Sequence, residues 1–397
     1  MAERGTTAEI TDAARPTAHP TAHVAPSRVM RALVMKAPWV LTAQDIPTPE
    51  PGPDDVLVKI LATGICGSDF HGFSGESGRR KPGQVMGHET VGYVVKVGGN
   101  VSDLPEGTCV TVNPVLSCDH CDVCRAGSEQ SCPSRTVIGV APELVSAFAE
   151  YLLVRRSNVI ALTGGIDPEL GALVEPLAVG YHAASRGACS SADTVLIIGG
   201  GPIGQAVFLA ARRLGATRVA VSDLNPNRRA LCAALGAAVI DPSARPLAES
   251  VVERLGAKAT LVIDAVGATA TLADAMDASA FGARVVLVGM AVPSVELAAY
   301  AISTGERTLI GSFCYSREDF AETAAWVGTT DAPLHQLIEG RVGFDDAEAS
   351  FTELAKGQSQ ASKVLVFPGG APSAGGALDT RGASETSGST ETKGREI

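Results

Sequence analysis

Residues that can bind metal ions occur in two groups in the first half of the chain. One group is four cysteines, Cys118, Cys121, Cys124 and Cys132. Four thiolates so close in sequence can close a tetrahedral zinc site, and a site filled by cysteine at all four positions is structural. The polar loop between them has little apolar material to hold a fold without a metal. Four free or disulfide-paired cysteines are the less favoured alternative.

The second group combines a thiol, an imidazole and carboxylates. Cys66 follows an apolar stretch, and His88 and Glu89 come further along the chain. Glu175 stands among apolar neighbours, where a carboxylate has to be paired or bound. Each residue alone has an ordinary explanation: a small buried residue, a hydrogen-bonded core histidine, a surface charge, a buried salt-bridge partner. Together they predict a second zinc site with an open position, as catalytic zinc requires.

A glycine-rich turn lies in the middle of the chain. Four apolar residues lead into Gly199, Gly201 and Gly204, which match G-x-G-x-x-G, and an apolar segment of helix length follows. In the order strand, turn, helix, the first glycine turns the chain, the second lets backbone approach a pyrophosphate, and the third lets helix pack on strand. The pyrophosphate is expected on the N–H groups of the helix that begins near Pro202 and Ile203. A turn without a ligand is the alternative.

Asp223 supports a dinucleotide site. It ends the next apolar strand, 19 residues after Gly204 (223 − 204 = 19). From this position an acidic side chain bonds the ribose 2′-OH of NAD and repels the 2′-phosphate of NADP. Arg228 and Arg229 lie nearby in sequence and soften that preference, so NADP is the alternative to NAD. Two further apolar strands end near Val266 and Gly289, which we expect to line the cofactor.

The elements that must position these residues differ along the chain. Short strands with regular turns between residues 31 and 112 predict a barrel-like β domain. Strands that alternate with helical stretches from 195 to 315 predict a doubly wound parallel sheet, so the fold class is α/β. Outside these regular patterns, we predict a loop over 44–53 and strands over 147–154, 308–315 and 363–367. We also predict a helical stretch after 167 that is broken near Pro176, and a helix over 318–338.

These patterns divide the chain into segments. Residues 1–29 and 369–397 are rich in small, polar and charged residues and are predicted to be disordered tails. Residues 30–185 are predicted to form the catalytic domain, with a cysteine lobe over 113–133. Residues 186–316 form the predicted NAD-binding domain, and 317–368 return to the catalytic domain.

Composition excludes several classes of protein. The chain has 397 residues, 45% of them apolar, and a formal net charge of −11. An acidic protein is a poor candidate for binding nucleic acid or an anionic membrane. We expect no membrane span, and the N-terminus lacks the apolar region of a secretory signal. Nine clustered cysteines favour metal binding in a reducing compartment, so we expect a cytoplasmic protein.

The motifs occur in an order that resembles one known family. Cys66-x-Ser68-Asp69-x-His71, Gly87-His88-Glu89, the four-cysteine lobe, Glu175-Pro176 and the glycine turn follow one another in the same way in zinc-dependent medium-chain alcohol dehydrogenases. The resemblance covers 30–368 and is greatest to the sorbitol, butanediol and threonine dehydrogenase branch, which also carries an acidic residue where Glu175 stands. It implies a GroES-like β-barrel domain, a Rossmann-type domain and a homodimer or homotetramer.

The resemblance also implies a metal shell. Cys66 and His88 would bind the catalytic zinc, and Glu175 and Glu89 would complete the shell directly or through water. Which of the two carboxylates binds directly is left open. Asp69 would orient His88, since a ligating histidine usually donates its other N–H. With the cysteine lobe, two zinc ions per chain are expected.

Catalysis is implied in the same way. Ser68 would contact the substrate oxygen, and His71 would pass the proton towards solvent. Zinc acts as a Lewis acid on the alcohol, and the nicotinamide accepts the hydride. The expected reaction converts a secondary alcohol or polyol, such as a diol, sugar alcohol or cyclitol, into a ketone.

One departure from the family pattern concerns the substrate. Sorbitol dehydrogenases carry an Arg-Tyr pair that we align with Cys314-Tyr315, so the arginine is missing here and sorbitol itself is doubtful. The alternatives are a threonine-type amino-alcohol dehydrogenase, a zinc-free quinone or enoyl reductase, and a non-catalytic dinucleotide-binding protein. The presence of Cys66, His88 and Ser68 argues against the last two.

Overall fold

Strands from the middle of the chain form a six-stranded parallel sheet in this computed structural model, which describes residues 26–163, 165–359 and 361–372. In order across the sheet they are β12 (Ala238–Ile240), β11 (Arg218–Ser222), β10 (Thr194–Ile198), β13 (Ala259–Asp264), β14 (Ser279–Leu287) and β15 (Thr308–Gly311). All five residues of β10 are buried, as expected of a strand covered on both faces.

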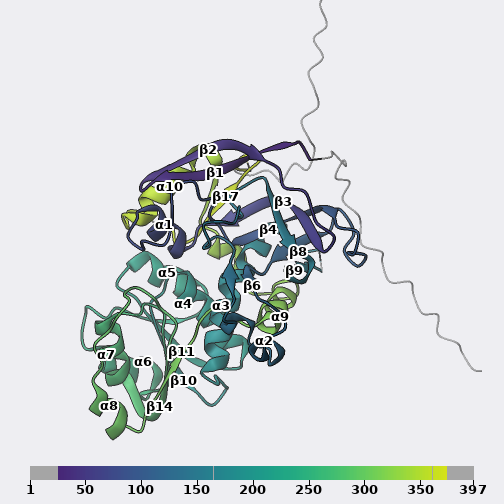
Figure 1. Cartoon of the computed structure of the whole chain (residues 1–397). Helices are drawn as coiled ribbons and strands as arrows, with labels where there is room; N and C mark the ends of the chain where they lie inside the picture. Colours follow the sequence, from purple (N-terminus) through teal and green to yellow (C-terminus); the bar gives the residue numbers. More distant parts are fainter. Residues whose placement is uncertain (1–25, 164, 360, 373–397) are drawn as a thin grey trace, which may run out of the picture. The chain divides into compact units, whose positions relative to one another are not determined.

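Helices cover both faces of this sheet (Figure 1). Val195 and Ile197 of β10 pack with α3 (Val174–Arg186) and α4 (Pro202–Arg213). Leu196 and Ile198 pack instead with α6 (Leu247–Leu255) and α7 (Thr269–Ala278). Because side chains alternate along a strand, the two helix pairs lie on opposite faces, as in a doubly wound fold. The neighbouring helices are α5 (Pro226–Ala234), α8 (Ala299–Thr304) and α9 (Arg317–Val327).

A second, seven-stranded sheet joins the beginning and the end of the chain. Its order is β16 (Gly340–Gly343), β17 (Val364–Phe367), β3 (Asp55–Gly64), β4 (Glu89–Val97), β5 (Cys109–Val112) and β9 (Val159–Ala161), and β8 (Tyr151–Arg155) pairs with β3. Leu365 of β17 pairs antiparallel with Gly64 of β3. This pairing brings Lys363 beside the loop that carries Cys66.

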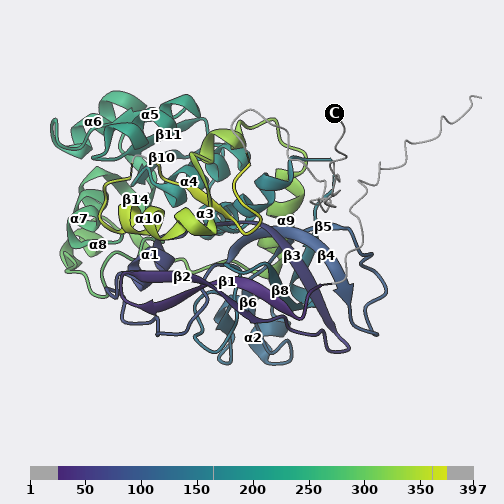
Figure 2. The same cartoon turned by 90° about the horizontal axis from the view of Figure 1, so that it is seen from above.

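Smaller elements complete the part of the chain built around this sheet, as Figure 2 shows from above. Two-stranded sheets pair β1 (Val29–Ala37) with β2 (Val40–Pro47) and β6 (Val115–Leu116) with β7 (Thr136–Val137). The remaining α-helices are α1 (Gly67–Phe73), α2 (Asp122–Arg125) and α10 (Phe344–Ala355). Short 3₁₀ helices cover Glu129–Ser131, Arg156–Asn158, Pro168–Leu173 and Leu334–Leu337.

The two large sheets follow the predicted segments. Every strand of the parallel sheet lies within 186–316, and β16 and β17 return from 317–368 to the seven-stranded sheet. Residues Pro26–Ala371 form one compact unit, so the domain limits themselves stay a prediction. β1 begins at Val29, the last residue of the predicted N-terminal tail. The tail predictions for 1–25 and 373–397 lie outside the described residues.

Two helix predictions were wrong in their limits. Pro176 does not break a helix, because it is the third residue of α3. The N–H groups of the first turn of a helix have no carbonyl partner within it, so proline removes no helical hydrogen bond at this position. Residues 318–338 are not one helix, because α9 ends at Val327 and a separate 3₁₀ turn begins only after Pro333. Gly328, a weak helix former, stands at the C-cap of α9.

One loop prediction and two strand predictions also needed correction. β2 runs on to Pro47 and pairs with β1 along its length, so only the second half of 44–53 is loop. β8 starts at Tyr151, later than the predicted 147. β15 ends at Gly311, and Cys314 has φ = 48°, a left-handed conformation that a strand does not accommodate. Cys314 and Tyr315 therefore follow the strand in a loop.

Candidate functional site

Cys66, His88 and Glu89 meet where β3 ends and β4 begins. Gly64 pairs with Glu89 across these strands, which places the Cys66 loop beside the first residue of β4. One ligand atom from each of the three lies within 4.8 Å of the other two. A Cβ on Gly64 would stand 2.2 Å from Glu89 Oε2, so only glycine leaves room for this carboxylate. Three of the four side chains that the sequence predicted to form the open zinc site thus lie together.

Asp69 lies fully buried beside this cluster. Its Oδ2 accepts the N–H of Cys66 at 3.1 Å, and its Oδ1 lies 3.7 Å from His88 Nδ1. The predicted orienting contact is thus close but longer than a hydrogen bond. In the described part of the chain, neither His88 Nδ1 nor Asp69 Oδ1 has a hydrogen-bond partner. Arg80, which no sequence motif indicated, lies 3.9 Å from Asp69 and donates to the Ser68 carbonyl.

The two candidate carboxylates each have a partner of their own. Lys363, only 3% exposed, donates to both oxygens of Glu89, at 2.7 Å for Oε1, and to the Ile65 carbonyl. The Tyr315 hydroxyl donates to Glu175 Oε1 at 2.8 Å. Glu175 is not one of the three residues whose ligand atoms cluster, although it lies close enough to His88 and Glu89 to interact electrostatically.

The donor set fits a divalent zinc ion. Burial raises the pKa of the Glu175 carboxyl, and the Glu89 carboxylate raises it further against the lowering effect of His88. A second buried negative charge here is unfavourable unless a cation compensates it. Thiolate, imidazole and carboxylate are the ligands that zinc takes in sites with an open position.

Ser68 and His71 lie on α1, directly after Cys66. Both are exposed, and three residues of separation place them on the same side of the helix. His71 Nδ1 lies 2.6 Å from Glu76 Oε2. A proton that leaves the buried cluster through Ser68 therefore has an exposed imidazole and carboxylate on its way to solvent.

The four cysteines of the lobe form a closed cluster. The Sγ–Sγ distances are 3.4 Å for Cys121–Cys124, 3.6 Å for Cys118–Cys132, and 3.9 and 4.0 Å for two further pairs. A tetrahedron with zinc–sulfur bonds of about 2.3 Å has edges of about 3.8 Å. A disulfide would bring two sulfurs to about 2 Å, and all nine cysteines are free thiols.

The glycine turn has the geometry that its three glycines predict. Gly199 has φ = 96°, and a Cβ on Gly204 would stand 1.7 Å from the Gly199 carbonyl oxygen. A Cβ on Gly201 would meet nothing closer than 3.8 Å, so the space above it is open. Pro202 and Ile203 open α4 directly after this turn. The first and third glycines thus shape the turn, and the second faces the space where a ligand fits.

Asp223 sits beside the turn at the end of β11. Its Oδ2 accepts the Gly200 N–H and its Oδ1 the Asn225 N–H, each at 2.7 Å. Arg228 Nη1 lies 3.8 Å from Asp223 Oδ2, whereas Arg229 is paired with Asp241 at 2.7 Å. Arg228 is therefore the arginine near the predicted ribose site.

Val266 and Gly289 meet the turn from the other side. A Cβ on Gly199 would come within 2.8 Å of Val266 Cγ2, and a Cβ on Gly289 would strike the Val266 backbone at 2.2 Å. The residues predicted to bind the cofactor thus gather at the carboxyl ends of neighbouring strands. Because β10 lies between β11 and β13, this is the point where strand order reverses and α/β folds bind ligands.

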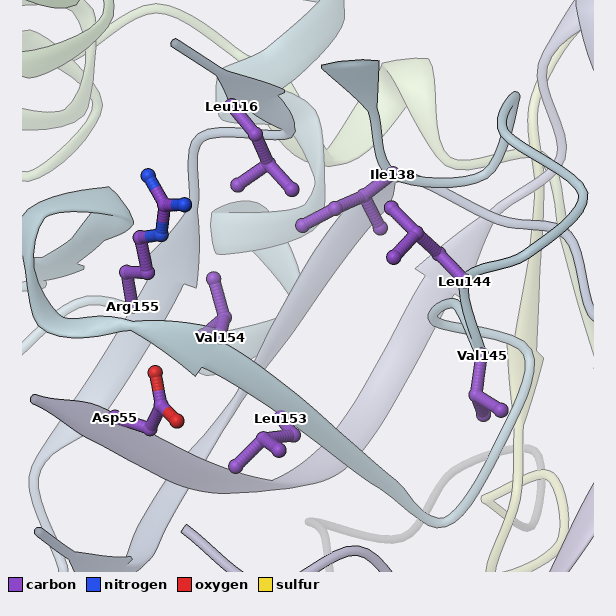
Figure 3. A pocket seen from close by; sticks show the side chains of 8 residues that line it. All are labelled: Asp55, Leu116, Ile138, Leu144, Val145, Leu153, Val154 and Arg155. Atoms are coloured by element: carbon purple, nitrogen blue, oxygen red, sulfur yellow. The ribbon is translucent and has the colours of Figure 1, made fainter. Parts of the chain in front are cut away.

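A separate hollow of about 140 Å³ lies away from these groups (Figure 3). Apolar side chains such as Leu116, Ile138 and Val154 line most of it, with Asp55 and Arg155 as its charged residues. None of the predicted ligand or cofactor residues lines it. We assign this hollow no role in binding zinc or the cofactor.

Sequence reasoning missed Lys363 and Arg80. Lys363 directly precedes the apolar run of β17, and a lysine at that position is a weak sign of a buried charge. Arg80 lies in a polar stretch that resembles ordinary surface. Only the fold places Lys363 beside Ile65 and Glu89, far away in sequence, and Arg80 beside Asp69.

Comparisons with known proteins identify the family of this chain. Residues 52–164 match the alcohol dehydrogenase GroES-like domain, and residues 202–329 match the zinc-binding dehydrogenase domain. An L-galactonate-5-dehydrogenase of Escherichia coli is 34% identical over 79% of this chain and 92% of its own length. An L-threonine 3-dehydrogenase of Mesorhizobium japonicum is 32% identical over 84% and 98%.

Two solved structures share the fold. A putative zinc-binding dehydrogenase of Sinorhizobium meliloti bound to NADP has a TM-score of 0.78 and 32% identity, over 86% of this chain and all of its own. An alcohol dehydrogenase of Escherichia coli CFT073 complexed with NADH has a TM-score of 0.80 and 28% identity, again over 86% and 100%.

The chain therefore belongs to the zinc-dependent medium-chain alcohol dehydrogenase family. The predicted combination of a GroES-like domain with a Rossmann-type sheet is confirmed. The protein is an oxidoreductase that transfers hydride between an alcohol or polyol and NAD, with zinc as its metal cofactor. Among the described residues, no helix is both long and apolar enough to cross a bilayer.

Proposed function

We propose that Cys66, His88 and a carboxylate from Glu89 or Glu175 hold a catalytic zinc, and that the four cysteines of the lobe hold a second, structural zinc. The observation that carries this proposal is the convergence of Cys66, His88 and Glu89 within 4.8 Å beside an unpartnered imidazole nitrogen. A zinc ion bound there supplies Lewis-acid stabilisation of negative charge on the alcohol oxygen.

The chain's own residues would then move the proton and hold the geometry. Ser68 accepts a hydrogen bond from the alcohol, and His71, paired with Glu76, carries the proton to solvent. Asp69 orients His88, and Tyr315 fixes Glu175. Groups in such a relay typically contribute about 10²–10⁴-fold to the rate.

For the cofactor, we propose NAD over NADP. The Asp223 carboxylate lies beside Gly200, where it would bond a ribose 2′-OH and repel a 2′-phosphate. Arg228, 3.8 Å from Asp223, is the group that would reduce this discrimination. Asp223→Ser should narrow the difference in kcat/KM between the two cofactors, and equal kcat/KM in the wild-type protein would contradict the proposal.

The substrate class that we propose is a secondary alcohol or polyol that becomes a ketone. An amino alcohol such as threonine is the second candidate, because an L-threonine 3-dehydrogenase is among the relatives. A panel of diols, sugar alcohols, cyclitols and threonine with NAD and NADP, followed by absorbance of the reduced nicotinamide, separates the two.

We also propose a homodimer or homotetramer in the cytoplasm. β15 ends the parallel sheet with one edge unpaired, and Leu309 on it is partly exposed. Phe281 of β14 and Tyr300 of α8 are 70% and 87% exposed, an apolar surface that favours association. Nine free thiols fit a reducing compartment. Sedimentation that gives a monomer at micromolar concentration would refute the assembly.

The decisive test of the zinc assignment is His88→Ala. We expect the zinc content to fall from two to one per chain and turnover to be lost, while NAD still binds through the glycine turn. Glu175→Gln and Glu89→Gln are compared side by side for zinc affinity. Losses of about 10–100-fold are expected, and the larger loss shows which carboxylate contributes more to zinc binding. If His88→Ala keeps both zinc ions and near-normal single-turnover hydride transfer, the catalytic site lies elsewhere.

A further inference from the structure

The segment from Tyr315 to Asp319 is attached to α3 at two points. The Tyr315 hydroxyl donates to Glu175 Oε1 at 2.8 Å, and Asp319 Oδ2 lies 2.7 Å from His182 Nδ1. Glu175 and His182 both belong to α3, and they are separated by about two helical turns. This segment therefore holds the side of α3 that carries the candidate catalytic carboxylate.

Arg317, between these two contacts, reaches the cysteine lobe. Its Nη2 donates to Asp119 Oδ1 at 2.7 Å, and its backbone N–H donates to Glu129 Oε2 at 3.3 Å. Asp119 directly follows Cys118, and the Glu129 carbonyl accepts the N–H of Cys132 at 3.0 Å. Both partners of Arg317 are thus tied through the backbone to cysteines of the lobe.

The contact between Arg317 and Asp119 is a charged one. Partial burial raises the pKa of the Asp119 carboxyl, but the hydrogen bond from Ser117 and the Arg317 guanidinium outweigh it and lower this pKa. The side chains of Arg317 and Asp119 are 35% and 38% exposed, so water screens the pair only in part.

The backbone on both sides of Arg317 is fixed by a helix cap. Ser316 is the N-cap of α9: its hydroxyl accepts the Asp319 N–H at 3.0 Å, and Asp319 Oδ2 accepts the Ser316 N–H at 3.1 Å. Such a capping box holds the first turn of a helix in one conformation. Tyr315 is only 1% exposed and packs on Phe320, with ring centres 5.2 Å apart. A displacement of Arg317 therefore reaches the Tyr315 hydroxyl.

We propose that the Tyr315–Asp319 segment couples the two metal sites, and that Arg317 is the positioning residue through which the cysteine lobe holds Glu175 beside the catalytic metal. The inference rests on the proposed function, since it needs a metal ion at each site. Coupling between two binding sites is reciprocal, so metal in the lobe strengthens metal binding at the open site and the reverse. The lobe thus contributes to the open site without contacting it.

The test measures the zinc affinity of the open site. Zinc-loaded protein is equilibrated with chelators of increasing strength, and the zinc retained per chain is counted. The release step that His88→Ala lacks belongs to the open site. In Arg317→Met we expect the open-site affinity to fall by about 5-fold or more, the lower end of typical coupling between sites. Arg317→Lys keeps the charge and should restore part of this affinity.

A double variant tests whether the effect passes through Tyr315. Tyr315→Phe removes the hydrogen bond to Glu175 and should weaken open-site zinc by about 10–100-fold. Adding Arg317→Met to Tyr315→Phe should then cost less than Arg317→Met costs in the wild type, because both act on the same carboxylate. Fully additive losses would overturn the inference.

Two further variants separate coupling from a general loss of stability. Asp119→Asn removes the charged partner in the lobe and should weaken open-site zinc as Arg317→Met does, with the lobe zinc retained. Arg156→Met is the matched control: Arg156 is 31% exposed and pairs with Asp103 at 2.7 Å, outside both the segment and the lobe, so open-site affinity should not change.

The inference is overturned if Arg317→Met binds open-site zinc like the wild type, or if Arg156→Met weakens it equally. Failure of the proposed function gives a different result, because the wild-type protein itself would then show no release step that His88→Ala lacks.

Discussion

Alanine at two glycines of the same turn should have opposite consequences. In Gly204→Ala the new Cβ would stand 1.7 Å from the Gly199 carbonyl oxygen, and both positions are fixed by backbone. An ordinary contact needs about 3.5 Å, so α4 has to move by nearly 2 Å away from β10. Overpacking of this kind costs about 1–3 kcal/mol, a large share of the roughly 5–15 kcal/mol that stabilises a typical protein.

In Gly201→Ala the same methyl group meets open space. The nearest atom, Arg228 Nη1, is 3.8 Å away, and Gly201 has φ = −71° and ψ = −173°, which alanine adopts without strain. Stability should change by no more than about 0.5 kcal/mol. The methyl group instead occupies the space that the pyrophosphate must enter, so we expect the Kd for NADH to rise at least about 10-fold, or roughly 1.4 kcal/mol.

Two measurements on both variants decide the matter. Thermal and urea unfolding by circular dichroism should separate Gly204→Ala from the wild type but not Gly201→Ala. NADH titration, by fluorescence at a temperature where all three proteins are folded, should detect the loss in Gly201→Ala. A Gly204→Ala protein as stable as the wild type, or a Gly201→Ala protein with unchanged NADH affinity, would show that the turn does not work as described.

Three further variants test the metal lobe, the buried lysine and an acid-sensitive ion pair. Cys124→Ser should remove one zinc ion per chain and lower the melting temperature; unchanged zinc content and melting would contradict a structural zinc. In protein freed of zinc, Lys363→Met leaves Glu89 buried without a cation and should cost about 3–5 kcal/mol in unfolding free energy, much of which the double variant with Glu89→Gln should restore. Burial raises the pKa of Asp193, but hydrogen bonds and the Arg284 guanidinium outweigh it and hold this pKa below its ordinary value. Its contribution to stability is therefore present above about pH 4 and lost as the pH falls below that, and Asp193→Asn should flatten this part of the stability profile.

The sequence alone determined the parts of this protein that are local. A G-x-G-x-x-G turn needs its glycines because of backbone contacts within a few residues, and Gly199 and Gly204 show those contacts. Four cysteines within one short loop can reach a single metal whatever the rest of the fold does. Alternating strands and helices over 195–315 likewise determined the parallel sheet, because its central strands β10 and β13 are covered on both faces. The ends of helices and strands were less well predicted. The position of Pro176 at the start of α3 and the left-handed conformation of Cys314 depend on the elements packed around them.

Only the tertiary structure decided which distant side chains share the buried site. Lys363 reaches Glu89 because β17 pairs with β3, and nothing near Lys363 in sequence indicates that pairing. Tyr315 reaches Glu175 across a similarly long stretch of chain. Sequence patterns report periodicity and local contacts, whereas the charge balance of a buried site depends on every element packed around it. For that reason the ligand types followed from the sequence, whereas the partners of the two carboxylates, Tyr315 and Lys363, followed from the fold.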